Sequence, residues 1–193
     1  MKVGTKSILF GAHCFFIHPI FVFIAWWKLY GFPWDPRLWV AFFVHDLGYW
    51  GKPNMDGPEG EAHPELGAKI MSIFDWCPRP MGEMHSKLGA GTWRFFTLFH
   101  SRFYAKKLGY NPSRLCAADK LATCITPRWI YLPMVNLSGE VHEYLRMHRE
   151  AIIGKGKYKG GACCAGSWED TESQKEWHRR MCKHMREWAY ENK

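Results

Sequence analysis

The feature that most constrains this chain is a histidine and an aspartate, His45-Asp46, placed directly after an apolar run. That run is Leu38-Trp39-Val40-Ala41-Phe42-Phe43-Val44. Two adjacent polar side chains beside so apolar a segment need partners when they are buried, and one metal ion can serve both. We therefore interpret the pair as part of a metal site and expect further ligands elsewhere in the chain.

The composition is that of a folded domain. Of 193 residues, 47% are hydrophobic and 17% are aromatic, which argues against disorder. This length can bury a core without disulfides. We predict one domain over 1–193, with a core at about 8–150, a mobile Gly- and Lys-rich loop at 154–167, and a C-terminal helix at 168–193 that docks on the body.

The charge balance indicates an anionic partner. A net charge of +8 favours a phosphorylated small molecule, a nucleic acid or a membrane surface. The apolar stretch from Ile8 to Trp27 is about long enough to cross a membrane, but its two histidines and one proline favour buried helices instead. Seven cysteines without a CxxC pair are typical of reduced thiols in a cytoplasmic protein.

Hydrophobic periodicity predicts an all-α fold, and no alternating strand pattern is found. Asp35 and Pro36 are expected to cap and open the second helix, and Pro127 and Pro133 to end the central helical series. The loop at 48–61 should form a rim of the site because it follows His45-Asp46 directly. The predicted helices cover 8–30, interrupted near His18-Pro19, then 37–47, 64–74, 93–105, 113–124, 141–153 and the tail.

The order of the polar motifs resembles the HD-domain superfamily of metal-dependent phosphohydrolases over roughly residues 13 to 122. The motifs are an upstream histidine, His45-Asp46, His63-Pro64-Glu65-Leu66-Gly67-Ala68, His100 and Ala118-Asp119-Lys120-Leu121. The element that begins at His63 is similar to the His-Pro-x-x-Gly-Ala element of the binuclear, HD-GYP-like branch. The resemblance implies an HD-domain helical bundle with a metal site between buried helices.

The same resemblance implies the ligands. By this resemblance, one divalent ion (Mn, Fe, Co, Ni, Mg or Zn) would be held by His18, His45, Asp46 and Asp119. His63 and His100 would help to hold a second ion or contact the substrate. The first histidine stays open, because His13 also lies at a suitable distance, 32 residues before His45. The resemblance also implies catalytic roles for Asp46, His63 and His100.

A bound ion would lower the pKa of a water molecule and neutralise charge that develops on a phosphoryl group. Basic side chains near the motifs would hold the phosphates of the substrate, and an aromatic ring could stack on a base. These substrate-binding candidates are Lys52, Arg102, Lys106, Arg114, Lys120 and Trp50. Ser101-Arg102-Phe103-Tyr104 replaces the Gly-Tyr-Pro element after His100, so specificity for cyclic dinucleotides is not carried over.

The function expected from these features is that of a phosphohydrolase, either a nucleotidase or a phosphodiesterase, acting on a nucleotide or a related small phosphoester. Two alternatives are a di-iron HD-type oxygenase and a nucleotide-binding or sensing protein on an HD scaffold. Nucleic-acid binding and homo-oligomerisation stay open. A second, less typical metal group would consist of Cys163, Cys164, His178, Cys182 and His184, whose spacing fits no standard zinc pattern.

Overall fold

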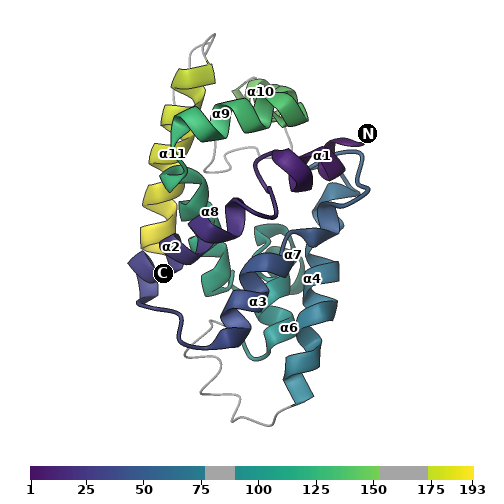
Figure 1. Cartoon of the computed structure of the whole chain (residues 1–193), viewed down its shortest axis with the longest axis vertical. Coiled ribbons are helices and arrows are strands. Elements are labelled where there is room, and N and C mark those ends of the chain that lie inside the picture. Colours follow the sequence, from purple (N-terminus) through teal and green to yellow (C-terminus); the bar gives the residue numbers. More distant parts are fainter. Residues whose placement is uncertain (77–89, 153–173) are drawn as a thin grey trace.

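The computed structural model describes residues 1–76, 90–152 and 174–193, and the regular structure of this part is entirely helical (Figure 1). The predicted fold class is therefore confirmed. The α-helices are α1 (Val3–Phe10), α2 (His18–Tyr30), α3 (Pro36–Val44), α4 (Pro64–Met71), α6 (Trp93–Leu98), α7 (Arg102–Leu108), α8 (Arg114–Ile125), α9 (Arg128–Ser138), α10 (Glu140–Ile152) and α11 (Gln174–Glu191). Three short 3₁₀ helices are η1 (Leu47–Tyr49), η2 (Gly60–Ala62) and η3 (Ser72–Trp76).

Helix α8 is the centre of the bundle. It packs against α2 and against the C-terminal helix α11 (Figure 1). Its buried alanines, which include Ala118 and Ala122, allow close approach of both helices. Trp26, Phe42 and Phe96 fill the core around these helices with aromatic rings. Asp119 lies in the middle of α8, so this carboxylate is held inside the core.

A second packing unit brings α4 against α6, α3 and η1. The approach of α4 to the end of α3 depends on Gly67, since a Cβ atom there would lie 2.5 Å from the carbonyl oxygen of Val44. A Cβ atom on Gly48 would lie 1.9 Å from the carbonyl oxygen of His63. These two glycines therefore let His63 lie beside the His45-Asp46 turn.

Several helix boundaries follow from local chemistry as expected. The Asp35 side chain accepts a 3.0 Å hydrogen bond from the backbone N–H of Arg37, and Pro36 opens α3. The chain from 8 to 30 is interrupted before His18-Pro19, because proline fits the first turn of a new helix. Among the described helices, none has both the length and the apolar character needed to cross a bilayer.

Some expectations about helices are wrong. The helix expected to begin at Ile8 is α1, which begins at Val3 and ends at Phe10, and the helix expected to reach residue 47 ends at Val44. Pro133 does not end a helix but lies inside α9, which continues to Ser138. The predicted helix at 93–105 is instead two helices, α6 and α7, and His100 lies in the turn between them. The expected docking helix begins at Gln174, whereas the predicted mobile loop at 154–167 lies outside the described residues.

Candidate metal centre

Six buried side chains, brought from five places in the chain, meet between the helices. One is in the middle of a helix and the others are at helix ends, where the chain turns. They are His18 at the start of α2, His45 and Asp46 after α3, His63 just before α4, His100 between α6 and α7, and Asp119 on α8. All six are the residues that the sequence motifs predicted as ligands.

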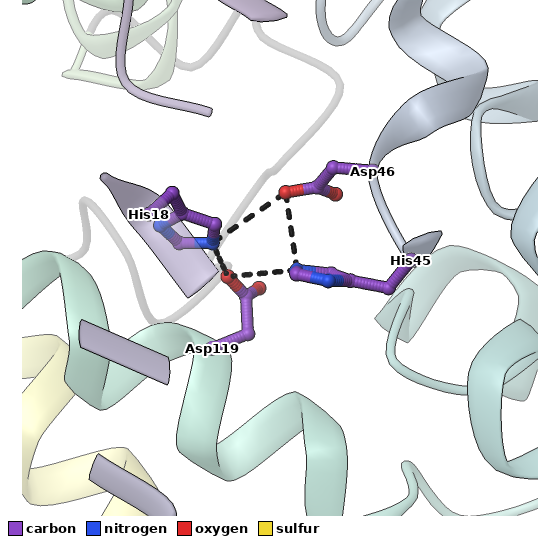
Figure 2. A group of neighbouring side chains, drawn as sticks. All are labelled: His18, His45, Asp46 and Asp119. Carbon is purple, nitrogen blue, oxygen red and sulfur yellow. Dashed lines mark hydrogen bonds and ion pairs between the residues drawn. The ribbon is translucent and has the colours of Figure 1, made fainter. Parts of the chain in front are cut away.

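Four of the six side chains form the first half of the cluster, shown in Figure 2. The Nε2 atom of His18 lies 3.0 Å from Oδ1 of Asp119 and 3.5 Å from Oδ2 of Asp46. The Nε2 atom of His45 lies 3.1 Å from the same Oδ2 of Asp46 and 3.9 Å from Oδ1 of Asp119. Two imidazole nitrogens and two carboxylate oxygens thus converge on one point, which suits a divalent transition metal.

The other oxygen of Asp46 belongs to a second group. Its Oδ1 atom lies 3.6 Å from Nε2 of His63 and 3.4 Å from Nε2 of His100. These two imidazole nitrogens are 3.1 Å apart. Two nitrogens each about 2.1 Å from one ion are roughly 3 Å apart when they meet at a right angle, so this pair can share an ion. Asp46 consequently faces both groups, with one oxygen for each.

Helix ends fix the direction of three of the imidazoles. The carbonyl groups of the last turn of a helix lack intrahelical partners. The Nδ1 atom of each histidine bonds to a carbonyl three residues earlier: His45 to Phe42 at 2.9 Å, His63 to Gly60 at 2.7 Å and His100 to Thr97 at 2.5 Å. A nitrogen that bonds to a carbonyl carries the hydrogen, so Nε2 presents its lone pair to the cluster.

The donor atoms have the properties that a metal site requires. Nε2 of His45 and Oδ2 of Asp46 are buried without a hydrogen-bond partner, although buried polar atoms are normally paired. A cation between the His45 imidazole and the Asp46 carboxylate would satisfy both atoms. Burial raises the pKa of the Asp46 carboxyl group, but the surrounding histidines outweigh this effect and hold the pKa well below its ordinary range. Burial acts in the same way on Asp119, where Lys120 and the nearby histidines outweigh it and also hold the pKa well below its ordinary range.

The imidazoles divide by charge. Burial lowers the pKa of His18, and burial together with the charge of His100 lowers the pKa of His63 well below its ordinary value. Both are thus neutral, as ligands must be. Burial also lowers the pKa of His45, but the charges of Asp46 and Asp119 outweigh this effect and raise it to about 10. The two carboxylates favour a cation at this point, which can be a proton or a metal ion.

Of the two candidates for the first histidine, His18 lies in the cluster and His13 does not. The Nδ1 atom of His13 is 2.9 Å from the hydroxyl of Ser7 and 3.6 Å from a carboxylate oxygen of Glu140. Its ring lies edge-on to that of His18, with 5.6 Å between centroids. His13 therefore lies one side chain away from the cluster, paired with Glu140.

A cavity of about 170 Å³ adjoins the cluster. Three of its lining residues each touch a different candidate ligand: His13 touches His18, the ring of Tyr49 stacks on His63 with centroids 3.9 Å apart, and Lys120 bonds to Asp119 at 2.8 Å. The lining residues are Ala12, His13, Tyr49, Asp56, Arg102, Lys120, Thr123, Tyr131, Tyr144, Met147, Trp177, Met181 and Met185.

Of the six predicted substrate-binding residues, Arg102 and Lys120 line this cavity. The other four do not: Lys106 is exposed on α7, Trp50 is 58% exposed, Lys52 is half-buried, and the Arg114 guanidinium lies over the ring of Tyr30. The sequence also gave no sign that α10 and α11 would supply a wall of the cavity, since these helices lie outside the motifs.

The second, cysteine-containing group is only partly described. Cys163 and Cys164 lie outside the described residues. The Sγ atom of Cys182 lies 3.5 Å from Nε2 of His178, and both side chains are buried between α11 and its neighbours. Within the described residues these two are not part of a cluster of three or more potential ligands.

Comparisons with protein-family models, with curated proteins and with solved structures found no match to this chain. The assignment of a function therefore depends on the cluster, the cavity and the motif order.

Proposed function

We propose that this protein is an HD-type metal-dependent phosphohydrolase that holds two divalent ions and acts on a nucleotide or a related small phosphoester. The observation that carries the proposal is the position of Asp46, whose two oxygens face two different pairs of imidazoles at 3.1 to 3.6 Å. A carboxylate placed in this way can bridge two ions. Paired ions are well suited to displacement at phosphorus, because they neutralise charge on both the entering and the leaving oxygen and activate a water molecule.

The side chains of the cavity support an anionic substrate. Lys120 donates to Oδ2 of Asp119, so its ammonium group is held at the boundary between the cluster and the cavity. Burial lowers the pKa of Lys120, but Asp119 outweighs it and raises the pKa above its ordinary value, so the group stays charged. Arg102 lines the same cavity from α7. These two cations would hold a phosphoryl group while the carboxylates and imidazoles hold the ions.

Two other residues would handle protons or shape the site. Asp56 lines the cavity, and burial raises the pKa of its carboxyl group, an effect that the charge of Lys120 reduces. A carboxyl group of this kind can donate a proton to a leaving oxygen. The ring of Tyr49 packs face to face on His63, with 12° between the planes, and so restricts the rotation of that imidazole.

The experiment that tests this function is phosphate release from a panel of phosphomonoesters and phosphodiesters by the purified protein. We expect activity that is lost with a chelator, restored by one of Mn, Fe, Co, Ni, Mg or Zn, and abolished in Asp46→Ala. The matched control is Glu187→Ala on α11, which changes an exposed carboxylate outside the cluster. A protein that binds metal but releases no phosphate from any member of the panel would contradict the proposal.

A second candidate, a di-iron HD-type oxygenase, is favoured by one specific observation. The cluster offers four imidazoles and two carboxylates, a nitrogen-rich set that suits iron better than magnesium. The presence of His63 and His100 beside Asp46 is what such a centre requires. Oxygen consumption by the iron-loaded protein in the presence of a substrate, with a mixed-valence iron signal, would support this candidate, and metal-dependent phosphate release under anaerobic conditions would contradict it.

A further inference from the structure

We propose that the cavity beside the metal centre selects a phosphoester whose organic part is small and apolar, and that it discriminates against nucleotides. The inference rests on the proposed function, since it names the substrate class for the same site. It follows from the size of the cavity and from its lining, which combines charged side chains beside the candidate ligands with methionine and aromatic side chains of α10 and α11.

The first argument is size. The cavity measures about 170 Å³. Pockets that hold drug-sized ligands measure roughly 300 to 1,000 Å³, whereas an apolar cavity of about 150 Å³ holds a benzene ring. A phosphoryl group at the cluster leaves room for one compact group beside it. A base and a ribose together are larger than one ring, so part of a nucleoside would lie outside the cavity.

The second argument is the pair of cationic side chains in the lining. Lys120 on α8 and Arg102 on α7 both line the cavity, and Lys120 is bonded to the candidate ligand Asp119. The Arg102 guanidinium also lies over the ring of Trp188 on α11, 5.3 Å from its centroid, which fixes its position. Two cations beside the candidate ligands would hold the anionic group of a substrate next to the cluster.

The third argument is the group of apolar side chains in the lining. Trp177, Met181 and Met185 are spaced by four residues on α11 and present one face to the cavity, and Met147 joins them from α10. The hydroxyl of Tyr144, another lining residue, already donates to Glu140 at 2.9 Å. A nucleobase placed against the three methionines would find no hydrogen-bond partner on them, which lowers its affinity. An alkyl or aryl group has no such cost, and unbranched methionine side chains can adapt to its shape.

The test uses ligands that cannot be hydrolysed. Binding of phenylphosphonate, methylphosphonate and the phosphonate analogue of adenosine monophosphate, in which a methylene group replaces the ester oxygen, to the metal-loaded protein is measured by calorimetry. We expect phenylphosphonate to bind at least roughly tenfold tighter than either of the others, because an apolar group in a fitted pocket typically gives that discrimination. Equal binding of phenylphosphonate and methylphosphonate, or tighter binding of the adenosine monophosphate analogue, would overturn the inference.

Variants locate the preference. Met185→Gln, on a half-buried position, and Met181→Gln, on a buried one, keep an unbranched side chain but add a polar amide to the wall. Each should remove most of the advantage of phenylphosphonate and leave methylphosphonate binding within twofold. The matched control is Lys183→Gln, exposed on the same helix, which should change neither. If a folded methionine variant keeps the full preference for phenylphosphonate, the proposed wall is wrong. Two variants are used so that the test can be read even if one of them folds poorly.

A parallel assay separates this inference from the function on which it rests. Phosphate release from phenyl phosphate and from adenosine monophosphate is measured on the same samples. Preferential binding of phenylphosphonate without release of phosphate would contradict the phosphohydrolase and keep the binding preference. Release of phosphate with adenosine monophosphate preferred would keep the phosphohydrolase and overturn the inference.

Discussion

Lys120 and Asp119 are consecutive residues of α8 whose side chains bind each other, with Nζ of Lys120 donating a 2.8 Å hydrogen bond to Oδ2 of Asp119. The second oxygen of Asp119 lies 3.0 Å from Nε2 of His18. Consecutive helical residues do not normally face one another, so the long lysine side chain must bend back toward the aspartate. As a result, one carboxylate links a cation that lines the cavity to the candidate ligands.

The first prediction concerns Lys120→Met, which keeps the length of the side chain and removes its charge. A hydrogen bond to a charged group contributes about 1.5 to 3 kcal/mol, so we expect kcat/KM for a phosphoester to fall roughly 10- to 100-fold. Metal content should stay unchanged, because Asp119 keeps the oxygen that faces His18. Steady-state kinetics and elemental analysis of the same sample measure both quantities.

The control for this variant is Lys106→Met, on an exposed position of α7 that does not line the cavity. It removes the same charge from the same protein and should leave kcat/KM within twofold. An equal effect of the two variants would indicate that Lys120 acts only through the net charge of the protein.

The second prediction concerns the buried carboxylate of Glu140. Its side chain is fully buried, and it accepts hydrogen bonds from the backbone N–H of Ala12 at 3.1 Å, the hydroxyl of Ser138 at 2.6 Å and the hydroxyl of Tyr144 at 2.9 Å. Replacement by glutamine removes the charge and leaves at least one donor without a good acceptor. We expect Glu140→Gln to lower the free energy of unfolding by about 2 kcal/mol at pH 7, measured by urea denaturation of the chelator-treated protein.

The effect should depend on pH in a defined direction. Burial raises the pKa of Glu140, but its hydrogen bonds and the charge of His13 outweigh this and lower the pKa below its ordinary value of 4.5. The folded state therefore binds the proton less tightly than the unfolded state, and the stabilisation is present above pH 4.5 and lost as the pH falls through the folded pKa. The difference between wild type and variant should shrink below pH 4.5. Glu187→Gln, exposed on α11, serves as the control and should show no such change.

The third prediction concerns the close approach of Gly48 to His63. A Cβ atom on Gly48 would lie 1.9 Å from the carbonyl oxygen and 2.8 Å from the Cα atom of His63, so the backbone must move. We expect Gly48→Ala to cost about 1 to 3 kcal/mol in the free energy of unfolding and to weaken metal binding, because His63 is displaced from Asp46. Calorimetric titration with metal and thermal unfolding measure the two effects.

Gly51→Ala separates crowding from backbone strain. Gly51 has a φ of 79° and no heavy atom within 4 Å of a Cβ placed on it. The substitution should cost about 1 to 2 kcal/mol through its left-handed conformation alone and leave metal affinity unchanged. If Gly51→Ala weakens metal binding as much as Gly48→Ala does, the role assigned to the close approach is incorrect.

The ligand cluster could be predicted from the sequence because each ligand lies in a short local pattern. His45-Asp46 follows an apolar run, His63 precedes Pro64 at the start of a helix, and Asp119 follows the buried pair Ala117-Ala118 on α8. Such patterns report local burial and helix ends. The order of these motifs along the chain named the six side chains that the structure brings together, but it left the first histidine open between His13 and His18.

The cavity could not be predicted in the same way. Its wall depends on how α10 and α11 pack on α8, which is set by long-range contacts that no local pattern encodes. Charge alone was misleading, since Lys106 and Lys120 are equally basic in the sequence but only Lys120 lines the cavity. Pro133 favours a helix end by its local chemistry, but Leu132 and Met134 continue α9 around it, because tertiary packing can retain a helix around one proline.

The central claim is that Asp46 bridges two metal positions, and metal content measures it most directly. The purified protein and its His100→Ala variant are each loaded with excess divalent metal, freed of unbound ions and analysed for metal per chain. The account predicts two ions in the wild-type protein and one in the variant, since His18, His45, Asp119 and one oxygen of Asp46 are intact there. One ion per chain in both proteins, or none in either, would contradict it.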